Sequence, residues 1–251
     1  MITKVKTATE LDAQRESGRM LATILDLVKN NIVVDITTKE LANMAAKELK
    51  ALGGKPTFLG YGGFPDVICI SVNSQVVHGI PGKYALQAGD IVSYDFGVTY
   101  KGMITDAARS SIVDGAKPVK SNIKLVNGTE QALQAGIQQL KNGVRVGTIS
   151  AAVQAEMEQF GFGIVKDLVG HGTGHQLHED PNIPNYGRAN TGMKLLSGMT
   201  IAIEPMSTLG ADAVYTAPDG WTVLTKDGSL SAHFEDTVLI TDDGSEVLTR
   251  I

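Results

Sequence analysis

Hydrophobic and polar positions alternate with helical spacing in the first fifty residues. One stripe recurs at intervals of three and four positions: Leu21, Ile24, Leu25 and Val28. This spacing places apolar side chains on one face of a helix. Thr7 and Glu10 have the spacing of a capping box, so we expect this helix to begin near Thr7. A second helix is predicted from Thr37, with Glu40 three residues later, up to the glycines at 53–54.

Shorter apolar runs typical of strands follow the second helix. Residues 67–72 predict a strand, and residues 90–113 predict a long hairpin that turns near Lys101. Two further helices are expected over 121–141 and 150–160, each ending at a glycine, before short strands and Gly- and Pro-rich loops. Because the order of two helices and then strands occurs twice, the chain is predicted to form two similar halves around one sheet.

The composition supports this mixed α/β prediction and excludes several classes of protein. The chain has 251 residues, of which 43% are hydrophobic and 20% are charged, and this suits a folded core rather than disorder. Its 28 glycines favour many tight turns. A single cysteine excludes a framework of internal disulfides. The net charge of −5, with no block of basic residues, argues against nucleic-acid binding.

The chain also lacks the sequence features of a membrane or secreted protein. No apolar run is long enough to span a bilayer, and the polar N-terminal segment lacks the apolar centre of a signal peptide. We therefore expect a cytoplasmic protein that binds neither membrane nor nucleic acid. A length of 251 residues fits one large domain, and we expect residues 1–251 to form it.

Three of the five histidines lie within eight residues, in the segment GHGTGHQLHEDP: His171, His175 and His178. A His-x3-His pair on a helix can bind zinc, but the glycines around this pair disfavour a helix. We interpret the segment as a glycine-rich loop that lets imidazoles approach a ligand closely. The alternative is a loop with incidental polar residues, although loops often carry functional side chains.

Two aspartates lie on opposite arms of the predicted hairpin. If the turn centres near Lys101, Asp95 and Asp106 fall almost opposite each other across the strands. Like charges in that position repel, and a bound cation is the simplest way to offset the repulsion. The alternative is that both carboxylates face solvent or that the register differs.

Two glutamates stand in apolar, strand-like runs near the C-terminus. Glu204 follows Ile-Ala-Ile and precedes proline, and Glu235 lies in the run 233–238. A buried carboxylate without a partner is costly, so such a residue usually has a partner or a metal ion. The alternative is simple alternation that places each glutamate on a solvated face, although the residues around Glu204 fit alternation poorly.

Taken together, these residues resemble the type I methionine aminopeptidases, which are metalloenzymes of the pita-bread fold. The matching motifs span nearly the whole chain in order: His78 in NSQVVHGIP, Asp95, Asp106 eleven residues later, His171 in GHGTGHQLHEDP, Glu204 in IEP, and Glu235. The resemblance implies an α+β fold, in which two pseudo-symmetric αα-β halves surround a curved antiparallel sheet. It also implies hydrolytic removal of the N-terminal methionine from nascent proteins when the second residue is small.

The resemblance assigns a role to each matching residue. Five side chains would bind two divalent metal ions: Asp95, Asp106, His171, Glu204 and Glu235. His78 and His178 would contact the substrate near the scissile bond, and Glu204 would also act as a proton shuttle. The pocket for the methionine side chain would be lined by Phe58, Tyr61, Phe64, Cys69 and Trp221. The family often has an aromatic residue at the position of Leu177, and His175 varies, so the detailed shape of the pocket is left open.

The implied chemistry agrees with the residue types. Four carboxylates balance the charge of two divalent cations, and one imidazole among many oxygens suits Mn, Fe or Co, with Zn left open. Two such ions about 3.5–4 Å apart can share a water and lower its pKa, so that it attacks the peptide carbonyl. Glu204 is then the natural proton acceptor.

Two alternatives stay open at this point. One is an X-Pro aminopeptidase or prolidase-like peptidase, although these usually carry an extra N-terminal domain. The other is an inactive member that binds peptides or nucleic acid, against which the presence of all five ligands argues. The resemblance further implies the ribosome as a partner and a monomeric enzyme. Because Ile2 is bulky, it also implies that the chain keeps its own Met1.

Overall fold

The fold was determined as a computed structural model, which describes residues 2–117 and 119–251. Met1, whose retention is expected from the sequence, lies outside these residues. The described chain contains α-helices α1 (Ala8–Asn30), α2 (Thr38–Leu52), α3 (Lys120–Ile137) and α4 (Val146–Phe160), and a short 3-10 helix, η1 (Tyr61–Gly63). The strands of the first half are β1 (Lys55–Pro56), β2 (Ile68–Val72), β3 (Gln75–Val77), β4 (Ile91–Tyr100) and β5 (Met103–Ile112). Those of the second half are β6 (Gly163–Ile164), β7 (Gly170–Gly172), β8 (Glu179–Ile183), β9 (Thr200–Ile203), β10 (Met206–Thr208), β11 (Val214–Thr216), β12 (Val223–Thr225), β13 (Ser231–His233), β14 (Asp236–Ile240) and β15 (Ser245–Val247).

The first two helices begin where their caps predict, and the second also ends where predicted. Thr7 and Glu10 form a complete capping box at the start of α1, and Thr37 and Glu40 form a second one at the start of α2. Helix α2 ends at Gly53, which has a φ of 81°. This left-handed conformation favours glycine, so the end predicted from the sequence is confirmed.

The second pair of helices differs from the prediction at two boundaries. Helix α3 ends at Ile137 with Gln138 as its C-cap, so the expected terminal glycine is wrong for this helix. Helix α4 begins at Val146, four residues before the predicted start, because Val146 and Ile149 are both buried and extend its apolar face. At its other end α4 has the expected glycine, Gly161, with a φ of 71°.

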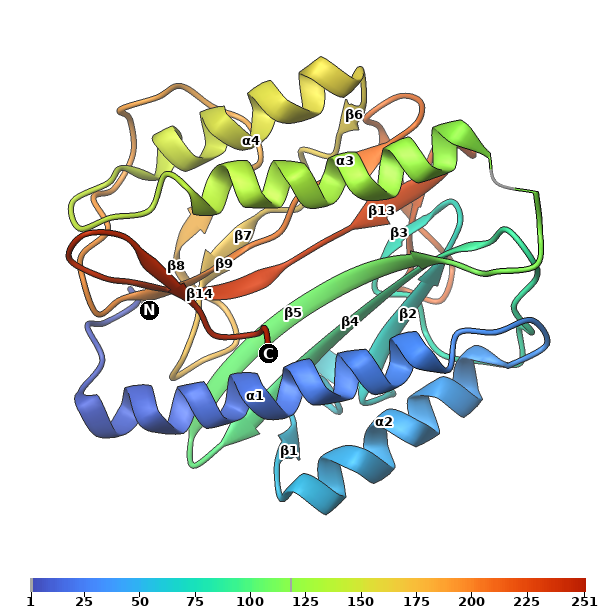
Figure 1. Cartoon of the computed structure of the whole chain (residues 1–251), viewed down its shortest axis with the longest axis horizontal. Helices are drawn as coiled ribbons and strands as arrows, with labels where there is room; N and C mark the ends of the chain where they lie inside the picture. The colour runs from blue at the N-terminus through green and yellow to red at the C-terminus, as the bar shows by residue number, and fades with distance from the viewer. Residues whose placement is uncertain (1, 118) are drawn as a thin grey trace.

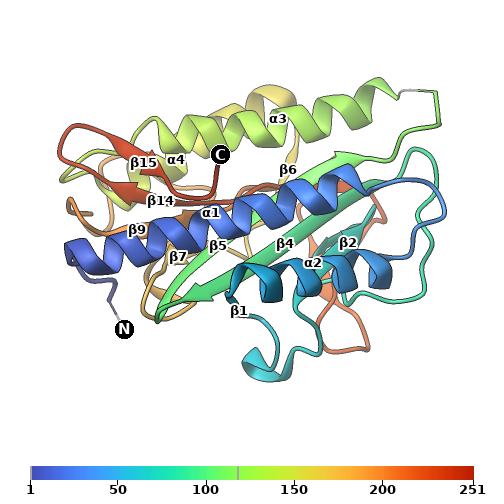
Figure 2. The same cartoon turned by 60° about the horizontal axis from the view of Figure 1, so that its bottom comes forward.

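The helices and strands form two similar halves, as Figure 1 shows. Helices α1 and α2 pack on β2, β4 and β5, whereas α3 and α4 lie over the second half, with α3 against β13 and α4 against β8. The rotated view in Figure 2 shows α1 crossing in front of β4 and β5. The predicted repetition of two helices followed by strands is therefore confirmed in three dimensions.

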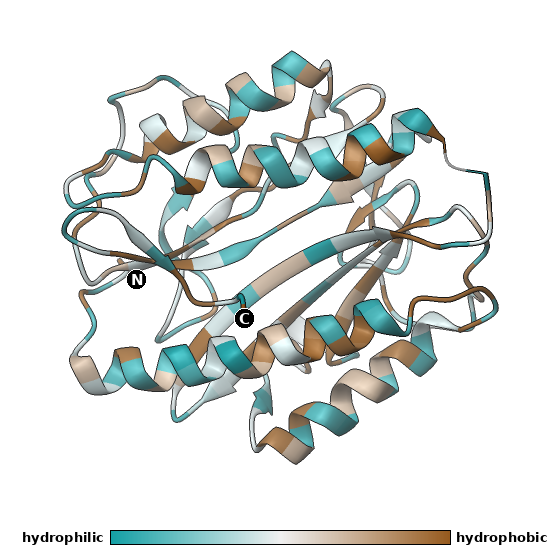
Figure 3. Cartoon of the chain, viewed as in Figure 1, coloured by the Kyte–Doolittle hydropathy of each residue, from teal (hydrophilic) through white to brown (hydrophobic). Residues whose placement is uncertain are grey.

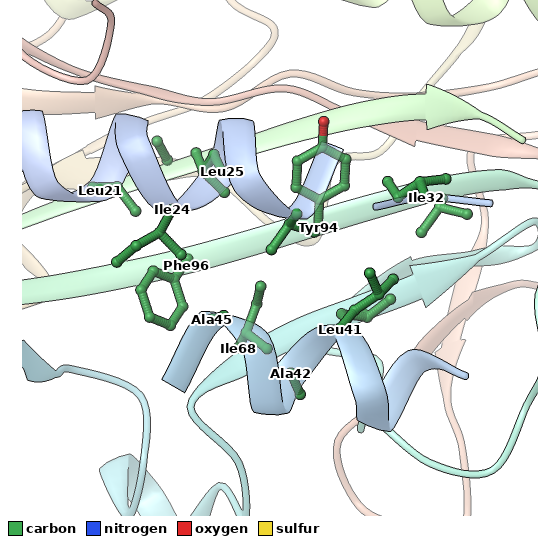
Figure 4. Packing of buried hydrophobic residues seen from close by; sticks show 14 of the residues in the cluster. Leu21, Ile24, Leu25, Ile32, Leu41, Ala42, Ala45, Ile68, Tyr94 and Phe96 are labelled. Atoms are coloured by element: carbon green, nitrogen blue, oxygen red, sulfur yellow. The ribbon is translucent and has the colours of Figure 1, made fainter. Parts of the chain in front are cut away.

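Each half has its own hydrophobic core. The first core joins Leu21, Ile24 and Leu25 of α1 to Tyr94 and Phe96 of β4, and these side chains meet in Figure 4. The second core joins α3 and α4 to β9 and β14. Burial of apolar side chains is the main favourable term in folding, so each helix pair is fixed on its own strands.

The strand ladders of the described chain are antiparallel, which agrees with the predicted α+β class. The expected single curved sheet is divided by its hydrogen bonds into sheets of four, three, three and five strands. A bridge between Ala108 and Glu235 joins the hairpin to the second half. Hydrophilic and hydrophobic residues alternate along the surface helices (Figure 3), and no helix in the described part is long and apolar enough to cross a membrane.

Candidate metal centre

A cavity of about 110 Å³ brings together all twelve side chains to which the family resemblance assigns a role. The acidic and histidine residues are His78, Asp95, Asp106, His171, His178, Glu204 and Glu235. The largely apolar residues are Phe58, Tyr61, Phe64, Cys69 and Trp221, joined by Val77 and Leu177. The cavity therefore combines a charged wall with an apolar one, which is the usual composition of a ligand site.

The hairpin supplies two carboxylates, but in a different register from the predicted one. Strands β4 and β5 turn at Lys101 as expected, yet Asp106 pairs with Gly97 and Asp95 pairs with Ala108. The two aspartates are thus diagonal neighbours rather than opposite residues, and their carboxyl groups are close enough to shift each other's pKa. Asp106 is held by Thr237 of β14, whose Oγ1 donates to its carbonyl oxygen at 2.8 Å and accepts from its N–H at 2.9 Å.

The second half supplies its ligands from three separate places. His171 lies within β7, so the segment interpreted as a loop is partly strand. Glu204 follows the last residue of β9, and Glu235 precedes β14. Nε2 of His171 lies 3.7 Å from Oε1 of Glu204. Ligand atoms of Asp106, His171 and Glu235 all lie within 4.8 Å of one another, which is close enough for a shared ion.

Backbone hydrogen bonds fix the direction of these side chains. The Nδ1 atom of His171 lies 2.9 Å from the carbonyl oxygen of Gly172, which leaves Nε2 for a ligand. The N–H of Glu235 donates to the carbonyl oxygen of Ala108 at 2.9 Å, across the two halves. Asn185 donates from Nδ2 to the carbonyl oxygen of Glu204 at 2.9 Å. The ligand atoms are therefore set by strands and not by flexible loops.

The ionised form of the four buried carboxyl groups is unfavourable without a bound cation. Burial raises the pKa of Asp95 to about 7. Burial, and then repulsion by neighbouring carboxylates, raises the pKa values of Asp106, Glu204 and Glu235 well above their usual range. Burial also lowers the pKa of His171 to about 3, so its imidazole is neutral and able to bind a metal ion.

The residues fit divalent metal ions. Within the described chain, three oxygen atoms in the cluster are buried without a hydrogen-bond partner: Oδ1 of Asp95, Oδ1 of Asp106 and Oε1 of Glu235. Buried carboxylate oxygens without a donor are costly, and cations would satisfy them. A donor set of carboxylates and imidazole suits Mn, Fe, Co or Zn.

His78 stands in the wall of the cavity on a fixed turn, with its ring centroid 6.3 Å from that of Trp221. Its φ is 59°, an unusual value for a residue with a side chain. The next residue, Gly79, is held by hydrogen bonds to Ile70 and Ser71, and a Cβ there would collide with the carbonyl oxygen of Ile70. Burial lowers the pKa of His78 to about 4, so the imidazole is neutral and can donate one hydrogen bond.

His178 stands between the metal ligands and the mouth of the cavity. Its ring meets that of His171 edge to face, with 4.3 Å between the centroids, and its Nδ1 lies 2.9 Å from the hydroxyl of Tyr61. Tyr61 is 46% exposed, so it lies at the rim of the pocket and not at its floor. Its contact with His178 gives it a positioning role that the sequence did not indicate.

The apolar wall of the cavity is a compact cluster. Phe58, Phe64, Cys69 and Leu177 are buried together, and Trp221 packs on them. The rings of Phe64 and Trp221 meet edge to face at 5.2 Å. An apolar pocket with aromatic walls suits an unbranched thioether side chain, because sulfur makes favourable contacts with aromatic rings.

The sequence missed residues that hold this site in place. Glu179 accepts hydrogen bonds from the N–H groups of His175 and Gln176, and its Oε2 lies 3.6 Å from Nζ of the buried Lys6. His175 itself contacts Glu10 at 2.8 Å and does not enter the cavity. The capping-box carboxylate at position 10 thus also anchors the histidine segment, which only the tertiary contact reveals.

The sequence analysis assigned no role to His233, the first residue of the run 233–238. The imidazole of His233 lies 3.7 Å from Oε2 of Glu204 and 3.9 Å from Oε2 of Glu235. Residues two apart in an extended segment share one face, so the spacing of His233 and Glu235 was a usable signal.

Known proteins match nearly the whole length of the chain. Residues 12–242 match the model of Metallopeptidase family M24. The chain is 45% identical over 247 residues to the methionine aminopeptidase of Clostridium perfringens, with 98% of both chains covered. It is 44% identical over 246 residues to methionine aminopeptidase 1 of Bacillus subtilis, again with 98% of both covered.

Solved structures show the same fold. The crystal structure of methionine aminopeptidase from Thermotoga maritima covers 100% of both chains with a TM-score of 0.97 and 42% identity. The predicted pita-bread fold is therefore confirmed. Prolidase from Pyrococcus furiosus matches 98% of this chain and 65% of its own with a TM-score of 0.78, but at 22% identity that likeness shows the fold alone.

Proposed function

Because the chain belongs to metallopeptidase family M24, as one of its type I methionine aminopeptidases, we propose that its cavity removes N-terminal methionine by hydrolysis. One observation carries the proposal. A single cavity holds the acidic and histidine ligands against a wall of apolar and aromatic side chains. The charged wall suits amide hydrolysis, and the apolar wall suits the methionine side chain.

We infer that two divalent metal ions are held by Asp95, Asp106, His171, Glu204 and Glu235. When bound, such ions polarise a carbonyl and lower the pKa of water, which is the chemistry that amide hydrolysis needs. The orphaned carboxylate oxygens of the described cluster support this assignment. The donor set fits Co, Mn, Fe or Zn without selecting among them.

The protein residues would bind the substrate and move its protons. Glu204, whose side chain is 12% exposed, reaches the cavity and is placed to accept a proton and pass it to the leaving amine. His178, held by Tyr61, would orient the substrate carbonyl. The neutral imidazole of His78 would donate a hydrogen bond on the far side of the scissile amide.

The surroundings of the site suggest its substrates. The buried cluster around Phe64 and Leu177 would enclose the methionine side chain and exclude water. A small second residue is expected from the family. We further propose that residues 1–251 act as one catalytic domain and as a monomer. Its substrates would then be nascent proteins in the cytoplasm, with the ribosome as a partner.

A comparison of peptides tests the activity. The metal-loaded enzyme should release methionine from Met-Ala-Ser, and much more slowly from Met-Ile-Ser, whose second residue is bulky. Ala-Pro-Gly tests the X-Pro alternative. The chelated enzyme is the matched control and should release nothing.

The outcomes separate the candidate functions. Release of alanine from Ala-Pro-Gly, with Met-Ala-Ser left intact, would identify an X-Pro peptidase. If the metal-loaded enzyme cleaves neither peptide, the proposed activity is wrong. The result would then favour an inactive protein that binds peptides.

A further inference from the structure

His233 is a buried histidine that the proposed reaction does not use. It is the last residue of β13, and 1% of its surface is exposed. Neither of its ring nitrogens has a hydrogen-bond partner among the described residues. An imidazole buried in this way is costly unless something satisfies it. The residues around His233 indicate which group satisfies its imidazole.

The Nε2 atom of His233 faces two carboxylates of the metal centre. It lies 3.7 Å from Oε2 of Glu204 and 3.9 Å from Oε2 of Glu235. Both distances are too long for a hydrogen bond. They match ligand atoms around one ion, because ligands that each lie about 2.0–2.2 Å from a metal stand roughly 3–4 Å apart.

Hydrogen bonds fix the backbone of His233, and this backbone position directs the imidazole toward Glu204 and Glu235. Its N–H donates to Oγ of Ser110 at 3.0 Å, and the same hydroxyl donates to its carbonyl oxygen at 2.8 Å. Strand β13 also pairs His233 with Met206 of β10. The next N–H, of Phe234, donates to the carbonyl oxygen of Pro205, beside Glu204. The backbone at His233 is thus held beside that of Glu204.

We propose that Nε2 of His233 is a sixth protein ligand of the metal centre, on the ion that Glu204 and Glu235 hold. This inference rests on the metal centre of the proposed function. The candidate ligand atoms then form two groups, and Glu235 belongs to both. One group is Asp106, His171 and Glu235, and the other is Glu204, His233 and Glu235. Within each group the ligand atoms all lie within 4.8 Å of one another. Each group contains one imidazole.

A second imidazole changes the metal preference of the site. Carboxylates alone suit Mg and Mn, whereas imidazole favours Fe, Co and Zn. The alternative role for His233 is a hydrogen bond that orients Glu204 without contact to an ion. His233→Gln separates the two roles, because an amide can keep a hydrogen bond at a similar position but is a poor metal ligand.

Proton NMR of the protein loaded with Co(II) gives a readout apart from activity. Each imidazole that binds cobalt through Nε2 keeps an exchangeable proton on Nδ1, which gives one strongly shifted resonance. We expect one such resonance fewer in His233→Gln than in the wild type. We also expect Co(II) affinity to fall more than about tenfold, the least that loss of a supporting residue around a metal typically costs.

His175→Gln is the matched control, because His175 lies outside the cavity and makes its contact with Glu10. It should keep the wild-type resonances and Co(II) affinity. If His233→Gln keeps both as well, His233 is not a ligand and the inference is overturned. If the wild type binds no Co(II), the metal centre of the proposed function fails too, which is a distinct result.

A crystal of the cobalt-loaded wild type settles the case in which His233→Gln does not fold. An anomalous peak about 2.0–2.2 Å from Nε2 of His233 would establish the ligand. Peaks confined to the other five side chains, with Nε2 beyond bonding distance, would overturn the inference.

Discussion

The two halves of the molecule contribute to the metal centre in different ways. The N-terminal half gives Asp95 and Asp106 from one hairpin, whose ladder pairs residues 91–100 with 103–112. The C-terminal half gives His171, Glu204 and Glu235 from β7 and from positions beside β9 and β14. The first pair is placed by one local ladder, whereas the second set is placed only when distant segments meet.

The position of the two aspartates depends on local structure, whereas the position of the other three residues depends on long-range contacts. A hairpin register follows from its turn, so the two aspartates stay neighbours whenever the hairpin forms. The second set depends on contacts such as the Ala108–Glu235 bridge and the hydrogen bonds of Thr237 with Asp106, which cross between the halves. Metal ions bound by both sets would strengthen the same connection, because binding to the native state alone adds to its stability.

Asp106→Asn should have the largest effect, since it removes a proposed ligand that the N-terminal half contributes. The substitution keeps the size of the side chain and the backbone contacts with Thr237, but it removes one negative charge from the centre. We expect metal loading and activity both to fall to background, as measured by elemental analysis and methionine release. Two full equivalents of metal in the variant would contradict the assignment.

Asp90→Asn is the matched control for that experiment. Asp90 is also a buried aspartate of the first half, but its carboxylate accepts hydrogen bonds from Asn73, Tyr84 and Gln87 outside the cavity. It should lower stability and leave the metal content of the folded protein unchanged.

His78→Ala should lower kcat by about 10²–10⁴, the range typical of lost general-acid or hydrogen-bonding help. Metal stoichiometry should stay at the wild-type value, because we propose that His78 contacts the substrate and is not one of the metal ligands. Kinetics, metal content and Tm are measured on the same variant. Loss of metal would make His78 a ligand, and a lower Tm with normal kcat would make it structural.

Metal affinity should fall as the pH falls below about 7. Burial raises the pKa of Asp95 to about 7 in the metal-free protein, so protons occupy this carboxyl below that pH and compete with the ion. The pKa of His171 is lowered to about 3 by burial, so this ligand stays neutral and does not compete above pH 4.

We therefore expect proton release on metal binding, and a loss of about tenfold in affinity per pH unit for each proton displaced. Calorimetry of Mn(II) binding at pH 6 and pH 7.5, in buffers of different ionisation enthalpy, measures both quantities. An affinity that is independent of pH would show that the centre is already ionised without metal.

Cys69→Ser should have the smallest effect. Cys69 lines the cavity, but burial and then the charge of Asp95 raise the pKa of its thiol well above the usual range. A nucleophilic cysteine needs a thiolate, so Cys69 is not the nucleophile. The variant should keep most of its kcat in the peptide assay. A complete loss of activity with metal still bound would refute this.

Several features could be predicted because they follow from neighbours in the chain. The capping boxes at Thr7 and Thr37, the glycine that ends α2 and the turn at Lys101 are short-range signals, and the structure confirms them. The start of α4 could not be placed, since Val146 joins the helix through burial against the second core and the N-cap residue, Arg145, makes no side-chain capping hydrogen bond.

The order of the proposed ligands along the chain could be predicted, because the type of each residue and its motif are local features of the sequence. The sequence by itself therefore determined the two-half fold, the family and the five carboxylate and histidine residues that we propose as ligands. The tertiary structure alone decided the division of the sheet and the approach of His233 to Glu204. The physical reason is that hydrogen-bond ladders and buried side chains from segments far apart in the chain set these distances, and no short stretch of sequence contains both partners.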